Sequence, residues 1–106
     1  MTDQELVKLA ANAAGMKTRP YANNSATLWH DYNSTDYHAW NPLEDDGDAL
    51  RLAVKLRMAL DVGEYGLVAF SGQGFERDVK SEQIDGDPYA ATRRAIVRAA
   101  AVMAAG

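Results

Sequence analysis

Residues 40–56 read WNPLEDDGDALRLAVKL, and this stretch decides how the rest of the chain is interpreted. Asn41 and Pro42 end an aromatic stretch, because proline has a fixed backbone angle and no amide hydrogen to donate to a sheet. An acidic run follows, and carboxylates are typical of a helix entrance because they accept hydrogen bonds from free backbone amides. Apolar residues then recur at three- and four-residue steps. The stretch therefore predicts that a strand ends and a helix begins, with Asp45 or Asp46 as the N-cap.

The segment before this stretch predicts a β-hairpin. Residues 27–32 and 36–40 are rich in aromatic side chains and flank the polar turn Asn-Ser-Thr, an arrangement typical of two paired strands. If that turn is the loop, the expected cross-strand pairs are Leu28 with Trp40 and His30 with His38.

The remaining segments are predicted from capping residues and from turn residues. A first helix with a Thr2–Glu5 capping box is expected over residues 3–14, followed by a polar loop over 17–27. The central helix is expected from 46 to about 61, with Gly63 beyond it. A second hairpin (65–70 and 75–80, around the turn 71–74), an acidic loop (81–87) and a last helix from 88 to about 106, opened by Asp87-Pro88, complete the chain.

This order predicts one α+β domain spanning residues 1–106. The chain runs helix, hairpin, helix, hairpin, helix, so we expect a mainly antiparallel sheet packed against three helices. Much of the apolar composition is alanine, which buries little area, so larger side chains should supply most of the hydrophobic stabilisation. They are Leu28, Trp29, Trp40, Leu43, Leu52, Leu56, Phe70 and Phe75.

Composition excludes several classes of function. The chain of 106 residues carries a net charge of −4, which argues against sequence-independent binding of nucleic acid. It has no cysteine, so it has no disulfide, thiolate metal site or cysteine nucleophile. No apolar run approaches the length of a membrane span, and the polar N-terminus does not look like a signal peptide. We therefore expect a cytoplasmic protein with no membrane association.

Two blocks, residues 40–56 and residues 87–99, resemble segments of small tailed-phage and prophage proteins. More distantly, the layout is similar to the phage NinX-type family, whose members also pair a central acidic, alanine-containing helix start with a C-terminal helix opened by proline. The resemblance implies a bacterial host cell and an accessory role directed at a host or phage macromolecule. It carries over no catalytic residue.

The clusters that could carry chemistry each have a simpler interpretation. His30, Asp31, Asp36 and His38 could bind a divalent metal ion in one register only, and a solvent-accessible hairpin face explains them as well. The acidic run lacks the ligand spacing of a calcium loop, and the turn 71–74 is followed by a strand rather than by the helix of a phosphate loop. We therefore expect no metal, no cofactor and no enzymatic activity.

Two functions are favoured over a third, a metal-dependent enzyme around His30 and His38, and each of the two has its own residues. The first is binding of a host or phage protein through hairpin aromatics and helix-entrance acids, which are Trp29, Tyr37, Asp45 and Asp46. The alternative is association with nucleic acid through the aromatics and a C-terminal basic stripe, which consists of Arg93, Arg94 and Arg98.

Overall fold

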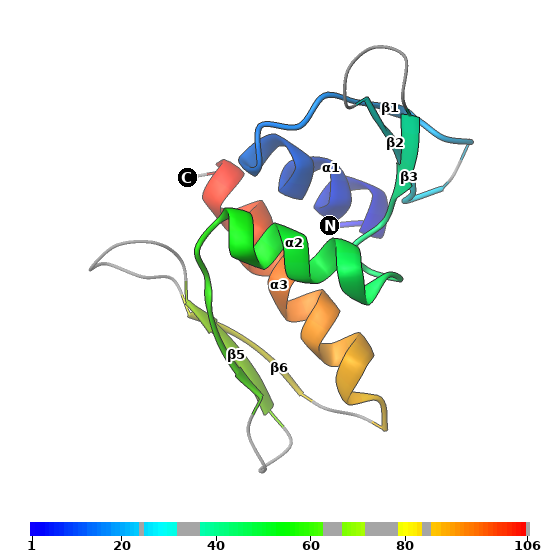
Figure 1. Ribbon diagram of the computed structural model, residues 1–106. Coiled ribbons are helices and arrows are strands. Elements are labelled where there is room, and N and C mark those ends of the chain that lie inside the picture. Colours follow the sequence, from blue (N-terminus) through cyan, green and yellow to red (C-terminus); the bar gives the residue numbers. More distant parts are fainter. Residues whose placement is uncertain (24, 32–36, 63–66, 72–78, 84–85, 106) are drawn as a thin grey trace.

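The computed structural model describes residues 1–23, 25–31, 37–62, 67–71, 79–83 and 86–105 (Figure 1). Helices and antiparallel strands both contribute, so the fold class is α+β. The elements in chain order are α1 (Asp3–Ala13), β1 (Thr18–Pro20), β2 (Leu28–Asp31), β3 (Tyr37–Trp40), α2 (Asp46–Lys55), β4 (Ala59–Val62), β5 (Leu67–Ser71), β6 (Val79–Gln83) and α3 (Pro88–Ala105).

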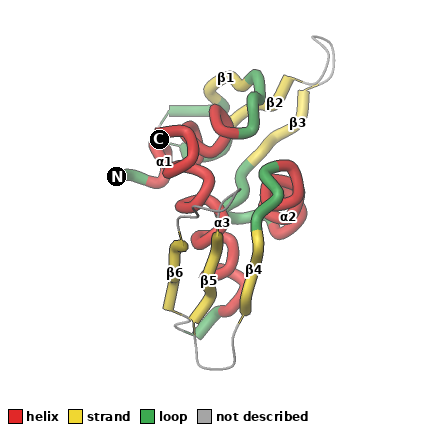
Figure 2. The backbone as a smooth tube through the Cα atoms, turned by 90° about the vertical axis from the view of Figure 1, so that its left-hand side faces the viewer, coloured by secondary structure: helices red, strands yellow, loops and turns green. Residues whose placement is uncertain are grey.

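The predicted arrangement of one sheet on three helices is wrong. Each expected hairpin carries an additional strand, giving two separate three-stranded sheets in the orders β1-β2-β3 and β4-β5-β6. Helix α3 lies at the centre, where it contacts α1, α2 and the strands β5 and β6. Figure 2 shows the two sheets at different ends of the molecule, with α3 running alongside the second sheet.

Helix α1 begins and ends as the sequence predicts. The Thr2 hydroxyl accepts a hydrogen bond from the Glu5 amide at 3.2 Å, which satisfies one of the free amides of the first turn. At the other end, the amides of Gly15 and Met16 donate to the carbonyls of Asn12 and Ala11. Gly15 has a φ of 69°, a left-handed conformation that glycine adopts without steric cost.

Helix α2 is shorter than predicted, because it ends at Lys55 rather than near Asp61. The chain reverses through Arg57, which has a φ of 54°. The amides of Arg57 and Met58 donate to the carbonyls of Val54 and Ala53, so this end has the same bonding pattern as the end of α1. Residues 59–62 then form strand β4 instead of a further helical turn.

The first sheet confirms the predicted register and corrects the predicted loop. Leu28 pairs with Trp40 and His30 pairs with His38 across β2 and β3. Residues 18–20, expected in a loop, form the edge strand β1 against β2. Proline is tolerated at an edge because its missing amide hydrogen removes no bond from the interior of a sheet.

The second hairpin is confirmed as an antiparallel pair, but its strands lie later in the chain than predicted. Strand β5 covers residues 67–71 and β6 covers residues 79–83, so part of the expected loop 81–87 is a strand. Residues 72–74 of the predicted turn lie outside the described residues. The last helix begins as expected at Pro88, with the Asp87 carboxylate accepting from the amides of residues 89 and 90.

Alanines of α1 and α3 form much of the core, which the emphasis on large side chains did not anticipate. Ala10, Ala11, Ala95 and Ala100 are completely buried in one apolar cluster. Small side chains let two helices approach closely, so these alanines gain contacts along the α1–α3 interface. Of the large residues, Trp40, Leu52 and Leu56 are buried, Leu28 and Leu43 pack partly buried against the cluster, and Trp29 is half-exposed.

Candidate binding surfaces

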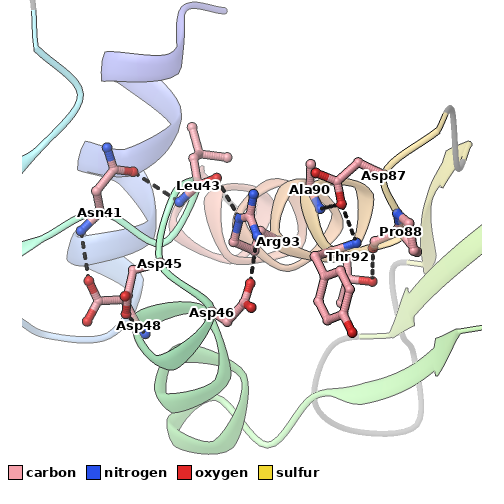
Figure 3. Close-up of polar contacts among 11 residues, drawn as sticks. Asn41, Leu43, Asp45, Asp46, Asp48, Asp87, Pro88, Ala90, Thr92 and Arg93 are labelled. Atoms are coloured by element: carbon pink, nitrogen blue, oxygen red, sulfur yellow. Dashed lines mark hydrogen bonds and ion pairs between the residues drawn. The ribbon is translucent and has the colours of Figure 1, made fainter.

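The acidic residues at the start of α2 form the centre of a polar junction (Figure 3). Asp48 is only 8% exposed. Its carboxylate accepts from the backbone amide of Asn41 at 3.0 Å and from the Arg51 guanidinium at 2.8 Å. The Asn41 side chain donates to the Thr27 hydroxyl and accepts from the Leu43 amide. These bonds join the end of the first sheet to the first turn of α2.

Asp45 is the N-cap of α2, which settles the choice between the two predicted capping residues. Its carboxylate accepts from the Asp48 amide at 2.8 Å and lies 3.8 Å from the Arg51 guanidinium. Gly47 leaves room for this arrangement, because a Cβ atom there would lie 3.2 Å from both groups. The capping interpretation of the acidic run is therefore confirmed for Asp45.

Arg93 connects α3 to the same junction. Its Nε donates to the Leu43 carbonyl at 2.8 Å, and one terminal nitrogen lies 2.6 Å from the Asp46 carboxylate (Figure 3). The Arg93 side chain is only 17% exposed, whereas that of Asp46 is 62% exposed. A planar guanidinium can satisfy a carbonyl and a carboxylate simultaneously, so Arg93 holds the entrance of α2 against the central helix.

The other two predicted arginines also have interactions within the protein. Arg94 pairs with Asp3 of α1 at 3.0 Å, and Arg98 also interacts with another group of the protein. The residues of the two competing functional hypotheses thus meet each other, because an acid from one hypothesis pairs with Arg93 from the other. The pairs Asp46–Arg93 and Asp3–Arg94 stabilise the contacts of α3 with α2 and α1.

The aromatic residues lie apart from this junction, on the first sheet. Trp40 is buried and pairs with Leu28. Because successive side chains of a strand point to opposite faces, Trp29, the residue after Leu28, lies on the face opposite Trp40. Arg19 and Ala39 are the cross-strand neighbours of Trp29. The Tyr21 ring lies against the Trp29 ring with a centroid distance of 4.7 Å and an interplanar angle of 41°. Tyr21 is 47% exposed, so this pair of rings is accessible to a partner.

Tyr37, the other predicted binding aromatic, is placed by its backbone alone. It pairs with Asp31 at the far end of β2 and β3, and its side chain lies outside the described part of the structure. Trp29 and Tyr37 therefore belong to the same sheet, and the position of the tyrosine ring relative to Trp29 stays a prediction.

The two histidines are directly opposite each other, in the register that metal binding would require. His30 is half-buried and His38 is exposed, and both interact with other groups of the protein. Among the residues that the structure describes, no group of three or more histidine and carboxylate side chains is placed to hold a metal ion.

No protein-family model, no curated protein and no solved structure matches the sequence or the fold. Within the described ranges, no helix has the combination of length and apolar character that crossing a membrane requires.

Sequence reasoning did not predict two groups of exposed residues as candidate binding residues. Tyr21 and Arg19 were assigned to a loop, and only the pairing of β1 with β2 brings them to Trp29. Leu50 and Val54 have the four-residue spacing of a second apolar stripe on α2, and this signal is visible in the sequence. Only the packing of α2 shows that these two side chains remain outside the core.

Proposed function

We propose that this protein is a non-enzymatic protein-binding module whose binding surface is the ring pair Tyr21–Trp29 with its neighbours Arg19 and Ala39, called here the aromatic surface. The observation that carries the proposal is the half-exposed tryptophan in contact with a 47% exposed tyrosine. Tryptophan, tyrosine and arginine are the residue types that dominate the energetics of protein interfaces. Two aromatic rings in contact also present a rigid surface that loses little entropy on binding.

The context proposed for this module is an accessory protein of a bacteriophage or prophage, acting on a host or phage protein. The support for this context is the resemblance of residues 40–56 and 87–99 to small phage proteins. The predicted contribution of Asp45 and Asp46 to the surface is weaker than that of the aromatics, because both carboxylates already bind groups within the protein.

The test is recovery of partners by a tagged copy from lysogenic or infected bacterial cells, with and without nuclease. Trp29→Ala and Tyr21→Ala should each reduce recovery of a stoichiometric protein at least tenfold, because truncation of a central aromatic costs about 2 kcal/mol or more of binding free energy. Tyr89→Ala is the matched control, since Tyr89 is an exposed aromatic (67%) on α3. Circular dichroism should confirm that all three variants are folded.

Association with nucleic acid is the second candidate, and the aromatic surface is the observation in its favour. Exposed rings can stack on bases, and Arg19 lies beside Trp29 in the sheet. Arg93 and Arg94 support this candidate less, because each pairs with an acid of the protein. Recovery that disappears after nuclease treatment, together with salt-dependent binding of single-stranded DNA, would replace the first proposal by this one.

A further inference from the structure

The outward side of α2 carries exposed aliphatic side chains. Its inward side is buried in the core through Ala49, Leu52 and Ala53. Two aliphatic side chains one helical turn apart remain on the outside, with Leu50 59% exposed and Val54 67% exposed. Figure 1 shows that this helix lies at the outside of the molecule, in front of α3.

The exposed charged residues of α2 that follow Leu50 are basic, whereas Asp46, one turn before Leu50, is an exposed acid paired with Arg93. Every exposed residue between positions 47 and 60 is either apolar or basic, although the protein carries a net charge of −4. They are Leu50, Arg51, Val54, Lys55, Arg57, Ala59 and Leu60. Arg51 pairs with Asp48, whereas Lys55 and Arg57 have no acidic partner within the part of the chain that the structure describes.

Arg57 provides a second, independent observation. It occupies the left-handed position that ends α2, the same position that Gly15 occupies at the end of α1. A side chain at this position carries a steric cost that glycine avoids. Residues kept in unfavourable backbone conformations are often found at functional sites. The attraction of basic side chains to the negative end of a helix explains Lys55 and Arg57, but it does not explain two exposed aliphatic residues beside them.

We infer that Leu50, Val54, Lys55 and Arg57 form a second docking surface, the apolar–basic surface, for an acidic amphipathic helix of a partner protein. Apolar residues at positions i and i+4 fit the apolar stripe of a second helix. The basic residues along the same side favour carboxylates that flank this stripe, which determines the charge of the partner. This surface is separate from the aromatic surface, so the inference does not depend on the proposed function.

A direct test uses a fluorescent synthetic peptide of about 20 residues, long enough to form a helix, with leucines at helical spacing and glutamates on both flanks. Titration with the full-length protein should raise its fluorescence anisotropy with a dissociation constant of about 10–100 μM. A peptide with every glutamate replaced by lysine should bind at least tenfold more weakly. If the two peptides bind equally, or if the acidic peptide does not bind at up to about 1 mM, the inference is wrong.

Variants of the protein locate the binding site, and control variants separate a loss of binding from a loss of folding. Leu50→Gln with Val54→Gln should weaken binding of the acidic peptide at least tenfold, while Lys8→Glu on α1 should leave it unchanged. Arg57→Gly removes a cation and relieves the backbone, so it should bind the peptide two- to fivefold more weakly although it unfolds at a higher temperature. Tyr21→Ala should bind like the wild type, which separates this surface from the aromatic surface.

Two other occupants are excluded by matched measurements. If sedimentation shows a dimer that the Leu50→Gln, Val54→Gln double variant abolishes, the occupant is a second copy of the chain and the inference is overturned. If the same variant loses binding to phosphatidylglycerol vesicles and the acidic peptide does not compete, the surface binds lipid instead. A monomeric protein that binds the peptide and ignores the vesicles supports the inference.

Discussion

The two ends of helix α2 differ in how their polar and charged groups are used. At the N-terminal end, Asp45, Asp46 and Asp48 all bind groups within the protein, and the helix is fixed to the first sheet and to α3. At the C-terminal end, Val54, Lys55 and Arg57 are exposed. One end therefore stabilises the fold, while the other leaves side chains available. Charge density alone distinguishes these two roles poorly, because the acidic end looks the more available in the sequence.

Among the polar residues, the largest effect is expected at Asp48, in the N-terminal junction. Asp48→Ala removes the acceptor of the Asn41 amide and the partner of Arg51, and a part-buried amide is left unsatisfied. The free energy of unfolding should fall by about 2–3 kcal/mol, measured by urea denaturation. Glu44→Ala, at an exposed acid four residues earlier, should change it by less than about 0.5 kcal/mol. Equal losses for the two variants would show that burial does not distinguish them.

The next largest effect is expected at Arg93. Arg93→Ala loses the bond to the Leu43 carbonyl and the pair with Asp46, both at a side chain only 17% exposed. We expect a loss of about 1.5–2 kcal/mol in the free energy of unfolding. Arg94→Ala breaks a single, more exposed pair with Asp3 and should cost at most about 0.5 kcal/mol. A larger loss for Arg94→Ala than for Arg93→Ala would show that Arg93 does not hold the entrance of α2 against α3.

A gain in stability is expected at the opposite end of the helix. Arg57→Gly replaces a side chain at a φ of 54° by the residue that tolerates this angle, and should stabilise the protein by about 0.5–1 kcal/mol. The reciprocal change at the end of α1, Gly15→Ala, should destabilise it by about 1 kcal/mol, since a Cβ atom there has open space and only the backbone angle opposes it. Thermal unfolding of both variants measures the contrast, and a neutral Arg57→Gly would mean that the arginine side chain contributes compensating contacts.

The smallest effect is expected on the outward side of α2. Leu50→Gln and Val54→Gln replace side chains that are more than half exposed, so each should change the free energy of unfolding by less than about 0.5 kcal/mol. Leu52→Ala, on the buried side of the same helix, should cost about 2–4 kcal/mol in the same denaturation experiment. A loss above about 1 kcal/mol for Leu50→Gln would place this residue in the core.

Helix starts were predicted correctly because they depend on residues within one turn of each other. Thr2 with Glu5, and Asp87 with Pro88, satisfy their own backbone amides locally, so the signal is contained in a few letters of sequence. The end of α2 was placed too late, because Leu60 continues the helical spacing of Leu52 and Leu56 while no glycine marks the reversal at Arg57. The edge strand β1 was missed because three residues are too few to show alternation.

The sequence by itself determined the α+β class, the three helix starts and the pairing of Leu28 with Trp40 and of His30 with His38, since all of these follow from local capping and from a short turn. Only the tertiary structure decided that the strands form two sheets, that alanines of α1 and α3 pack together, and which side of α2 is buried. It also decided that Arg93 pairs with Asp46 across 47 residues of chain. The physical reason is that contacts between distant segments depend on how helices pack in three dimensions, and neither charge nor periodicity within one segment specifies its partner.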